Sequence, residues 1–335
     1  MVTIKDISDR LGVSPATVSK ALNGYSDIAE ATVENIRKTA KEMGYLPNAA
    51  ARTLKTNRTH NIGVLFTDKM RSGLAHEYFS PILESFKVEA ERLGYDITFI
   101  SQNIGSTPMS YYDHCRYRNC DGVVIASVTF DDPMVLELVQ SDIPTITIDY
   151  VFNNRTAILS DNVGGIRDLV TYIHSKGHRK IAYIHGEDTS VTQKRLSSFY
   201  HTCLQLDITL PDKYIKSANY HDPPSSGLAT RELLALPERP TCIMYPDDFS
   251  FIGGMNEIER SGLRIPEDIS VVGYDGIYLS QVLRPRLTTL RQDTHAIGTH
   301  AAAQLIKAIE NPKSSIIEQI MVKGELLPGD SVRQL

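Results

Sequence analysis

The first 45 residues of the chain place apolar and polar side chains with the period of short helices. One apolar stripe recurs at intervals of three and four residues, at Ile4, Ile7 and Leu11. Thr3 precedes this stretch and Asp6 follows three residues later, which is the spacing of a capping box. Gly12 comes directly after it, and glycine tolerates the positive φ at which helices commonly end. The pattern predicts a short first helix that ends in a tight turn.

A second helix is expected to follow this turn. Ser14 and Pro15 suit its N-cap and first position, because the hydroxyl can accept a hydrogen bond and proline lacks the amide that would be unpaired there. Its apolar side consists of Val18, Ala21 and Leu22. Its other side carries small or polar side chains, namely Ala16, Thr17, Ser19, Lys20 and Asn23. Such a face can approach base edges and phosphates closely, so the pair of helices is interpreted as a DNA-binding helix-turn-helix. The alternative is a small helical subdomain with a solvated polar face.

A third helix is predicted from Glu30 to Met43, with Gly44 as its end. Ala29 stands where a capping side chain is favoured, and the missing cap should cost about 1 kcal/mol. The segment from Pro47 to Lys55 could form one more helix of about seven residues capped by Asn48, which is too short to persist alone in water. Leu54 lies in it among basic residues with no core to enter, and a simple linker with one exposed leucine is the alternative interpretation.

From Asn61 onward the pattern changes to alternating strands and helices. Short apolar runs predict buried parallel strands at 62–67, 97–101, 122–127, 145–149, 181–186, 214–218, 242–246 and 269–275. Helices are expected near 78–93, 108–117, 131–140, 163–176, 190–206, 226–236 and 248–261. Two such series predict an α/β core of two doubly wound parallel-sheet lobes beside the small all-α head. Closing strands at 287–292 and 317–325 are expected to return the chain between the lobes.

The charge is distributed unevenly over this organisation. Residues 1–60 contain nine Lys and Arg against six Asp and Glu, whereas the rest of the chain contains 26 against 34. The head therefore carries a net charge of +3 and the core −8, as expected when only the head meets a phosphate backbone. The four cysteines lack the spacing of a disulfide framework or a zinc site. Without a signal peptide or an apolar run long enough for a membrane span, we expect a cytoplasmic protein that binds no membrane.

Motifs of catalysis are missing from the sequence. It has no GxGxxG after an early strand, no GxxxxGK[ST] and no GxSxG, so it is not expected to be an enzyme or to need a cofactor. His174 and His178 have a spacing compatible with a metal, but Gly177 should end their helix between them. No catalytic residue and no metal ligand is therefore assigned.

The segments VSPATVSKALNG and MGYLPNAAARTLKTNRTHNIGVL resemble the lac repressor/purine repressor (LacI/GalR) family of bacterial transcription factors. The resemblance extends over essentially the whole chain. It implies a helix-turn-helix domain at 1–46, a hinge helix and linker at 47–60, and an effector-binding and dimerisation core at 61–335. The core architecture is shared with periplasmic sugar-binding proteins. Crossovers near residues 161, 290 and 321 would give a first lobe of about 61–160 and 291–320 and a second of about 161–290 and 321–335.

The same resemblance implies a mode of DNA binding. In the family the segment after the head is a hinge helix that folds on operator DNA, and the residue matching Leu54 is an apolar wedge in the minor groove. Ala50 and Ala51 would let two such helices pack closely in a homodimer on a near-palindromic operator. The predicted DNA-contacting residues are Thr3, Ser14, Ala16, Thr17, Ser19, Lys20, Asn23, Asn48, Ala51, Arg52, Leu54 and Lys55. A tetramer is not expected, because no heptad tail follows Gly324.

Ligand should bind at the carboxyl ends of the core strands. The candidates there are Asp68, Tyr78, Phe79, Ser127, Asp149, Arg195, Asp247 and Asp275. An arginine and several aspartates from two lobes suit a polyhydroxylated ligand, and an aromatic ring suits the apolar face of a sugar. By resemblance, Arg195 matches the arginine that contacts effector, and Asp275 matches its acidic partner. Alternatively, the aspartates cap helices or loops, Arg195 forms an exposed ion pair, and the two aromatic residues belong to the core.

We therefore expect a repressor of carbohydrate-utilisation genes whose operator affinity is controlled by a small sugar-like effector. A regulator of the same family controlled by a phosphocarrier protein or a purine corepressor is one alternative. A sugar-binding module without a regulatory role is another.

Overall fold

The computed structural model describes residues 2–22, 24–46 and 58–335. The contacts divide the chain into a head that ends at Thr59 and a core that begins at His60. Within the described residues, no helix is long and apolar enough to cross a membrane.

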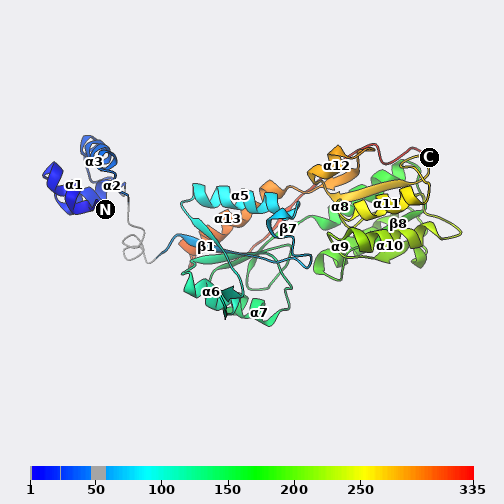
Figure 1. The fold of residues 1–335 in the computed structure, drawn as a ribbon, viewed down its shortest axis with the longest axis horizontal. Coiled ribbons are helices and arrows are strands. Elements are labelled where there is room, and N and C mark those ends of the chain that lie inside the picture. Colours follow the sequence, from blue (N-terminus) through cyan, green and yellow to red (C-terminus); the bar gives the residue numbers. More distant parts are fainter. Residues whose placement is uncertain (1, 23, 47–57) are drawn as a thin grey trace. The chain divides into compact units, whose positions relative to one another are not determined.

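The head contains three helices, α1 (Ile4–Leu11), α2 (Pro15–Leu22) and α3 (Glu30–Glu42) (Figure 1). They enclose a small core of Ile7, Val18, Ala21, Ile36 and Ala40. The predicted capping box is present: the Asp6 amide donates to Thr3 Oγ1 at 3.3 Å, and the Thr3 amide donates to Asp6 Oδ2 at 2.7 Å. Gly12 adopts a φ of 66°, which lets the chain turn into α2. Ala29 makes no side-chain cap for α3, as expected.

The first lobe of the core is a six-stranded sheet in the order β13-β7-β6-β5-β1-β2, in which all neighbours are parallel. Its strands are β1 (Asn61–Phe66), β2 (Asp96–Phe99), β5 (Gly122–Ser127), β6 (Thr145–Ile148), β7 (Thr156–Ser160) and β13 (Gln319–Val322). Val124 packs with α5 (Phe79–Arg92) and α13 (Thr294–Glu310), whereas Val123 packs with α6 (Tyr111–Tyr117) and α7 (Pro133–Gln140). Helices therefore cover both faces, as the period of two along a buried strand requires (Figure 1). A short hairpin, β3 (Asn103–Ile104) and β4 (Thr107–Pro108), and a turn, η1 (Gly73–Ala75), complete this lobe.

The second lobe repeats this plan in the order β14-β12-β11-β10-β8-β9, with β14 antiparallel at one edge. Its strands are β8 (Ile181–His185), β9 (Ile215–Ser217), β10 (Cys242–Met244), β11 (Ser270–Asp275), β12 (Thr288–Arg291) and β14 (Glu325–Leu327). One face packs against α8 (Asn162–Ser175) and α9 (Ser190–Gln205), and the other against α10 (Pro223–Leu234) and α11 (Phe251–Arg260). The short α12 (Tyr278–Val282) and η2 (Asp212–Tyr214) lie in its connections.

The chain passes three times between the lobes. The first passage is at Asp161, between β7 and α8, and the second is at Gln292 and Asp293, between β12 and α13. The third is at Lys323 and Gly324, between β13 and β14. The second and third passages lie two or three residues after the predicted crossovers.

One sequence expectation differs from this structure, and two of its elements were not expected. The single strand predicted over 317–325 is wrong, because β13 pairs with β7 in the first lobe and β14 pairs with β12 in the second. The helix α13 and the strand β7 were not predicted. Both lie at the passages between lobes, where the regular alternation of strands and helices changes.

Candidate functional site

The outer face of α2 in the head presents the side chains expected to meet DNA. Ala16 and Lys20 are exposed, and Thr17 and Ser19 are partly exposed. The Lys20 ammonium forms an ion pair with Asp27 in the loop before α3. Thr3 and Ser14 use their hydroxyls as helix caps, and Ser14 Oγ accepts the Thr17 amide at 3.1 Å. The remaining predicted DNA contacts lie outside the described residues, namely Asn23, Asn48, Ala51, Arg52, Leu54 and Lys55.

A cavity of about 670 Å³ lies between the two lobes at the carboxyl ends of their strands. The eight residues predicted to contact an effector all line it: Asp68, Tyr78, Phe79, Ser127, Asp149, Arg195, Asp247 and Asp275. The first five belong to the first lobe and the last three to the second. The structure therefore brings together residues that are as far apart in sequence as Asp68 and Asp275.

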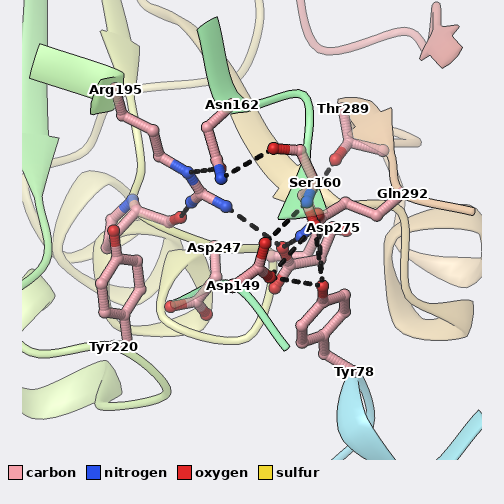
Figure 2. Close-up of polar contacts among 12 residues, drawn as sticks. Tyr78, Asp149, Ser160, Asn162, Arg195, Tyr220, Asp247, Asp275, Thr289 and Gln292 are labelled. Atoms are coloured by element: carbon pink, nitrogen blue, oxygen red, sulfur yellow. Dashed lines mark hydrogen bonds and ion pairs between the residues drawn. The ribbon is translucent and has the colours of Figure 1, made fainter. Parts of the chain in front are cut away.

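Arg195 is buried in the wall of this cleft, with 4% of its surface exposed, and Figure 2 shows its polar contacts. It lies in the second turn of α9, whose N-cap is Thr189. Its Nε donates to Asn162 Oδ1 at 2.7 Å, and another of its nitrogens donates to the Pro246 carbonyl at 2.9 Å. A third nitrogen lies 3.9 Å from Asp275 Oδ1. The alternative of an exposed ion pair is therefore wrong, since the Arg195 side chain is buried.

The end of β6 forms the other side of the cleft. The Asp149 carboxylate accepts the Ser160 amide at 2.6 Å and the Ser160 hydroxyl at 3.1 Å. The Tyr78 hydroxyl lies 3.3 Å from Ser160 Oγ and donates to Gln292 Oε1 at 3.2 Å. Burial raises the pKa of Asp149, and the hydrogen bonds from Ser160 oppose this rise. Because Gln292 lies at the second passage between lobes, this network reaches the connection itself (Figure 2).

The two aspartates that follow β10 accept hydrogen bonds that hold neighbouring segments in place. Asp247 accepts the amides of Ser250 at 2.7 Å and His221 at 2.9 Å, which holds the loop before α11. Asp248 accepts the Thr289 hydroxyl at 2.6 Å and the Ile277 amide at 2.9 Å, and is fully buried. The alternative in which Asp247 caps the following helix is not what the structure shows, because the amides that it accepts lie before α11, whose N-cap Ser250 has no side-chain cap. Asp247 also lines the cavity.

Asp275 ends β11 and faces Arg195. Its Oδ1 accepts Gln292 Nε2 at 2.7 Å. Burial raises the pKa of this carboxyl to about 7, an effect that Arg195 opposes and Asp247 reinforces. Asp275 is thus an acid of the cleft whose charge changes near neutral pH.

Three residues that border the cleft have positive φ angles. Asp149, His221 and Asp275 have φ angles of 56°, 55° and 101°, in the region that residues other than glycine rarely adopt. Such conformations cost about 1–3 kcal/mol each and persist where the surroundings fix them, most often at functional sites. Here hydrogen bonds to Ser160, Asp247 and Gln292 hold the three residues in place.

Aromatic side chains form part of the cavity wall. The Phe130 and Tyr150 rings stack with centres 4.2 Å apart and an angle of 7° between their planes. Tyr220 lies on the opposite lobe, and the Arg195 guanidinium carbon is 5.6 Å from its ring centre. Tyr78 is 7% exposed and packs with Phe79, so both residues join the core while they border the cavity.

Sequence reasoning did not identify several members of the site, namely His76, Phe130, Tyr150, Asn162, Tyr220, His221 and Gln292. Gln292 ends the strand predicted at 287–292 and Tyr150 directly follows the one predicted at 145–149, so both could have been found by the rule that ligands bind at the carboxyl ends of strands. The others lie in loops or at helix starts, where the pattern of apolar residues carries no signal.

The side chains around the cavity are suited to binding a small ligand. The cavity contains carboxylates of both lobes, one fixed guanidinium and aromatic surfaces. Charged groups of fixed orientation bind neighbouring hydroxyls with strong, directional hydrogen bonds. A ligand that contacts Asp149 and Arg195 together would touch both lobes.

Comparison with known protein families gives two matches. A model described as "Bacterial regulatory proteins, lacI family" matches residues 3–48. A model described as "Periplasmic binding protein-like domain" matches residues 170–332.

Whole-chain similarities agree with these matches. The chain is 33% identical over 339 residues to the "Probable HTH-type transcriptional repressor ExuR" of Bacillus subtilis (strain 168), covering 100% of this chain and 99% of that protein. It is 30% identical to the "HTH-type transcriptional repressor PurR" of Vibrio vulnificus (strain CMCP6), covering all of both chains at 100%. A lac repressor dimer bound to operator and the anti-inducer ONPF has a similar structure, with a TM-score of 0.78, 24% identity and 99% coverage of both chains. A complex of the transcriptional regulator CelR with cellobiose has a TM-score of 0.72 and 23% identity, covering 99% of this chain and 100% of that one.

Proposed function

This chain belongs to the lacI family of bacterial regulatory proteins and is a DNA-binding transcriptional repressor, and from this premise we propose that a small sugar-like effector in the cleft controls its operator affinity. The regulated genes would be those of carbohydrate utilisation. Two chains would pair and present two heads to a near-palindromic operator.

The observation that carries this proposal is the position of Arg195 opposite Asp149 and Asp275 in a cavity lined by both lobes. A polyhydroxylated molecule offers donors to the carboxylates and acceptors to the guanidinium, and its apolar face can lie on an aromatic ring. A cavity of about 670 Å³ lies in the range of small-molecule sites.

The strand β1 runs from the start of the core to the cleft, where Thr67 and Asp68 follow its last residue and line the cavity. β1 begins at Asn61, directly after the segment that joins the head. The His60 amide donates to Asp121 Oδ2 at 2.7 Å, which fixes the beginning of the core to the first lobe. An effector that alters how the lobes meet would thereby alter the start of β1 and the cost of arranging residues 47–57 on DNA. Such coupling between sites is typically about 1–3 kcal/mol.

A purine corepressor is the second candidate effector. The stacked pair of Phe130 and Tyr150 in the cavity wall offers a flat aromatic surface that suits a planar base.

A thermal-shift screen of the full chain tests the proposal and separates these candidates. The panel contains mono-, di- and trisaccharides, sugar phosphates and purines. A ligand at 100 times its Kd should stabilise the native state by about 2.7 kcal/mol, which is readily measured. A sugar hit that also alters operator binding supports the proposal, and a purine hit supports the second candidate. If no compound of the panel shifts the melting temperature while operator binding is intact, both candidate effectors are contradicted and control by a protein partner is favoured.

A further inference from the structure

Three potential metal ligands from two lobes meet in the cleft. His76 and Glu77 precede α5 in the first lobe, and His221 lies between β9 and α10 in the second. One donor atom of each residue lies within 4.8 Å of the other two. Donor atoms around a tetrahedral ion at about 2.1 Å are separated by about 3.4 Å, and small movements of the Glu77 and His76 side chains would give the group this spacing.

An independent observation marks the same place. His76 is buried, with 8% of its surface exposed, and its Nδ1 has no hydrogen-bond partner among the described residues. A buried polar atom without a partner costs about 1–3 kcal/mol and calls for an explanation such as an ion. The ring that carries this atom is stacked on His221, with 4.2 Å between the ring centres.

The hydrogen bonds around His221 indicate which of its nitrogens is available. Ser72 Oγ donates to Asp68 Oδ2 at 2.9 Å, so its oxygen is free to accept from His221 Nδ1, which lies 3.4 Å away. The other nitrogen, Nε2, then presents a lone pair to Glu77 Oε2 at 2.6 Å. At this distance a proton lies between the two atoms, and a metal ion would replace that proton once the atoms separate to about 3.4 Å. Ligating histidines commonly engage their second nitrogen in this way.

His221 is also held rigidly in position. Its ring is stacked on the Phe249 ring, with 4.0 Å between the ring centres and 6° between the planes. Its amide donates to Asp247 Oδ2 at 2.9 Å, and its φ of 55° is strained. The protein thus maintains an unfavourable backbone conformation that points this imidazole at the first lobe's ligands.

We propose that His76, Glu77 and His221 bind one divalent transition-metal ion of the Zn²⁺ class, which ties the two lobes together at the cleft. Two imidazoles and one carboxylate are a set that Zn²⁺ accepts, with a fourth position open to water or to an effector hydroxyl. Mg²⁺ prefers oxygen ligands and would not be held by these residues. All three ligands line the cavity, so a bound ion would stand beside the effector.

Zinc titration of the full chain tests this proposal. Protein freed of metal and kept reduced is titrated with Zn²⁺ by calorimetry, and Co²⁺ reports the coordination geometry through its visible spectrum. We expect one ion per chain, a spectrum typical of nitrogen and oxygen ligands, and a rise in melting temperature with Zn²⁺ but not with Mg²⁺. Glu77→Gln and His221→Ala should weaken Zn²⁺ binding at least tenfold.

Two further variants make the result specific. His201→Ala removes an exposed histidine of α9 and should leave Zn²⁺ affinity unchanged. Cys120→Ser removes a thiol beside Cys115 and should also leave it unchanged. The proposal is overturned if no ion binds, if Glu77→Gln and His221→Ala bind Zn²⁺ as tightly as the unaltered chain, or if Cys120→Ser abolishes binding. If His221→Ala does not fold, Glu77→Gln still tests the proposal. Operator binding is measured separately, so the metal site and the proposed function are tested independently.

Discussion

The guanidinium group of Arg195 lies on the ring of Tyr274, with 3.6 Å between the guanidinium carbon and the ring centre. Tyr274 belongs to β11 and is 1% exposed, so this contact fixes α9 against the central strands of the second lobe. Stacking on an aromatic face leaves the edges of the guanidinium free for hydrogen bonds in its plane. The residue that we expect to contact effector is therefore positioned before any ligand arrives.

Arg195→Lys should separate effector response from DNA binding. A lysine supplies a point charge but not the planar fork that reaches Asn162 and the Pro246 carbonyl, so these buried acceptors lose their partners. We expect the free energy of unfolding to fall by about 2 kcal/mol and effector affinity to fall at least tenfold. Operator affinity without effector should stay within twofold, as measured by fluorescence anisotropy of labelled DNA.

Arg231→Lys is the matched control for this substitution. The Arg231 side chain is 62% exposed and pairs with the buried Glu257, which keeps its second ion pair with Arg260, so the substitution should cost less than about 1 kcal/mol. If Arg195→Lys retains the full effector response, the assignment of Arg195 to the effector site is wrong.

Asp275→Asn should change how stability depends on pH. Burial raises the pKa of Asp275 to about 7 in the native state, whereas the unfolded chain releases this proton near pH 3.8. Between these values the native state holds the extra proton, so its stability falls as the pH rises to about 7 and then stays level. The amide cannot ionise. Measured by unfolding in urea, the free energy of unfolding of the variant relative to that of the unaltered chain should therefore rise by about 2 kcal/mol between pH 5 and pH 7.

The control for this pH dependence is Asp268→Asn. Asp268 is exposed to solvent, and hydrogen bonds from the Arg264 side chain and amide hold its pKa below 3.8. Its charge does not change between pH 5 and pH 7, so its effect on stability should be constant there. The free energies of unfolding of Asp275→Asn and the unaltered chain could also differ by the same amount at pH 5 and pH 7. This result would contradict the prediction, because it would show that the Asp275 carboxyl is already ionised at pH 5.

Ala16→Glu should abolish operator binding without harming the head. Ala16 is the second residue of α2 and is exposed, so a carboxylate there faces the DNA phosphates but is favourable to the helix terminus. Ala31→Glu places the same charge at the second residue of α3, where the side chain is also exposed. We expect at least a 100-fold loss of operator affinity for Ala16→Glu and less than a fivefold loss for Ala31→Glu. Equal losses would mean that α2 is not the recognition helix.

Leu54→Ala tests the minor-groove wedge that the family resemblance implies. Loss of the apolar side chain should leave the melting temperature unchanged and weaken operator binding at least tenfold, because the wedge contributes only in the bound, kinked DNA. Leu46→Ala truncates another leucine, which follows α3 and is 75% exposed, and should have little effect. Operator affinity that is unchanged in Leu54→Ala would refute the wedge.

The head and most of the core strands follow from local patterns in the sequence. Thr3 and Asp6 have the spacing of a capping box and form one, and Gly12, Gly44 and Gly177, which are predicted to end their helices, adopt positive φ. These features depend on neighbours within a few residues, so the sequence specifies them directly.

Features that depend on distant contacts were harder to predict. β7 is five residues long and fully buried, so it lacks the alternation that would distinguish it from a loop. α13 carried a usable signal that was overlooked: buried apolar residues at helical spacing after Asp293, whose carboxylate caps the helix. The contact of Glu77 with His221 joins residues 144 positions apart through the packing of two lobes, and no local pattern indicates it.

The central claim is that a ligand of the cleft controls DNA binding. Its most direct test is the affinity of the full chain for an operator duplex, selected from random sequences, measured with and without the ligand that the thermal-shift screen identifies. Coupling of about 1–3 kcal/mol predicts a change of operator Kd of roughly 5- to 150-fold, and its loss in Arg195→Lys. An operator Kd that is the same with saturating ligand would contradict the account, however tightly the ligand binds.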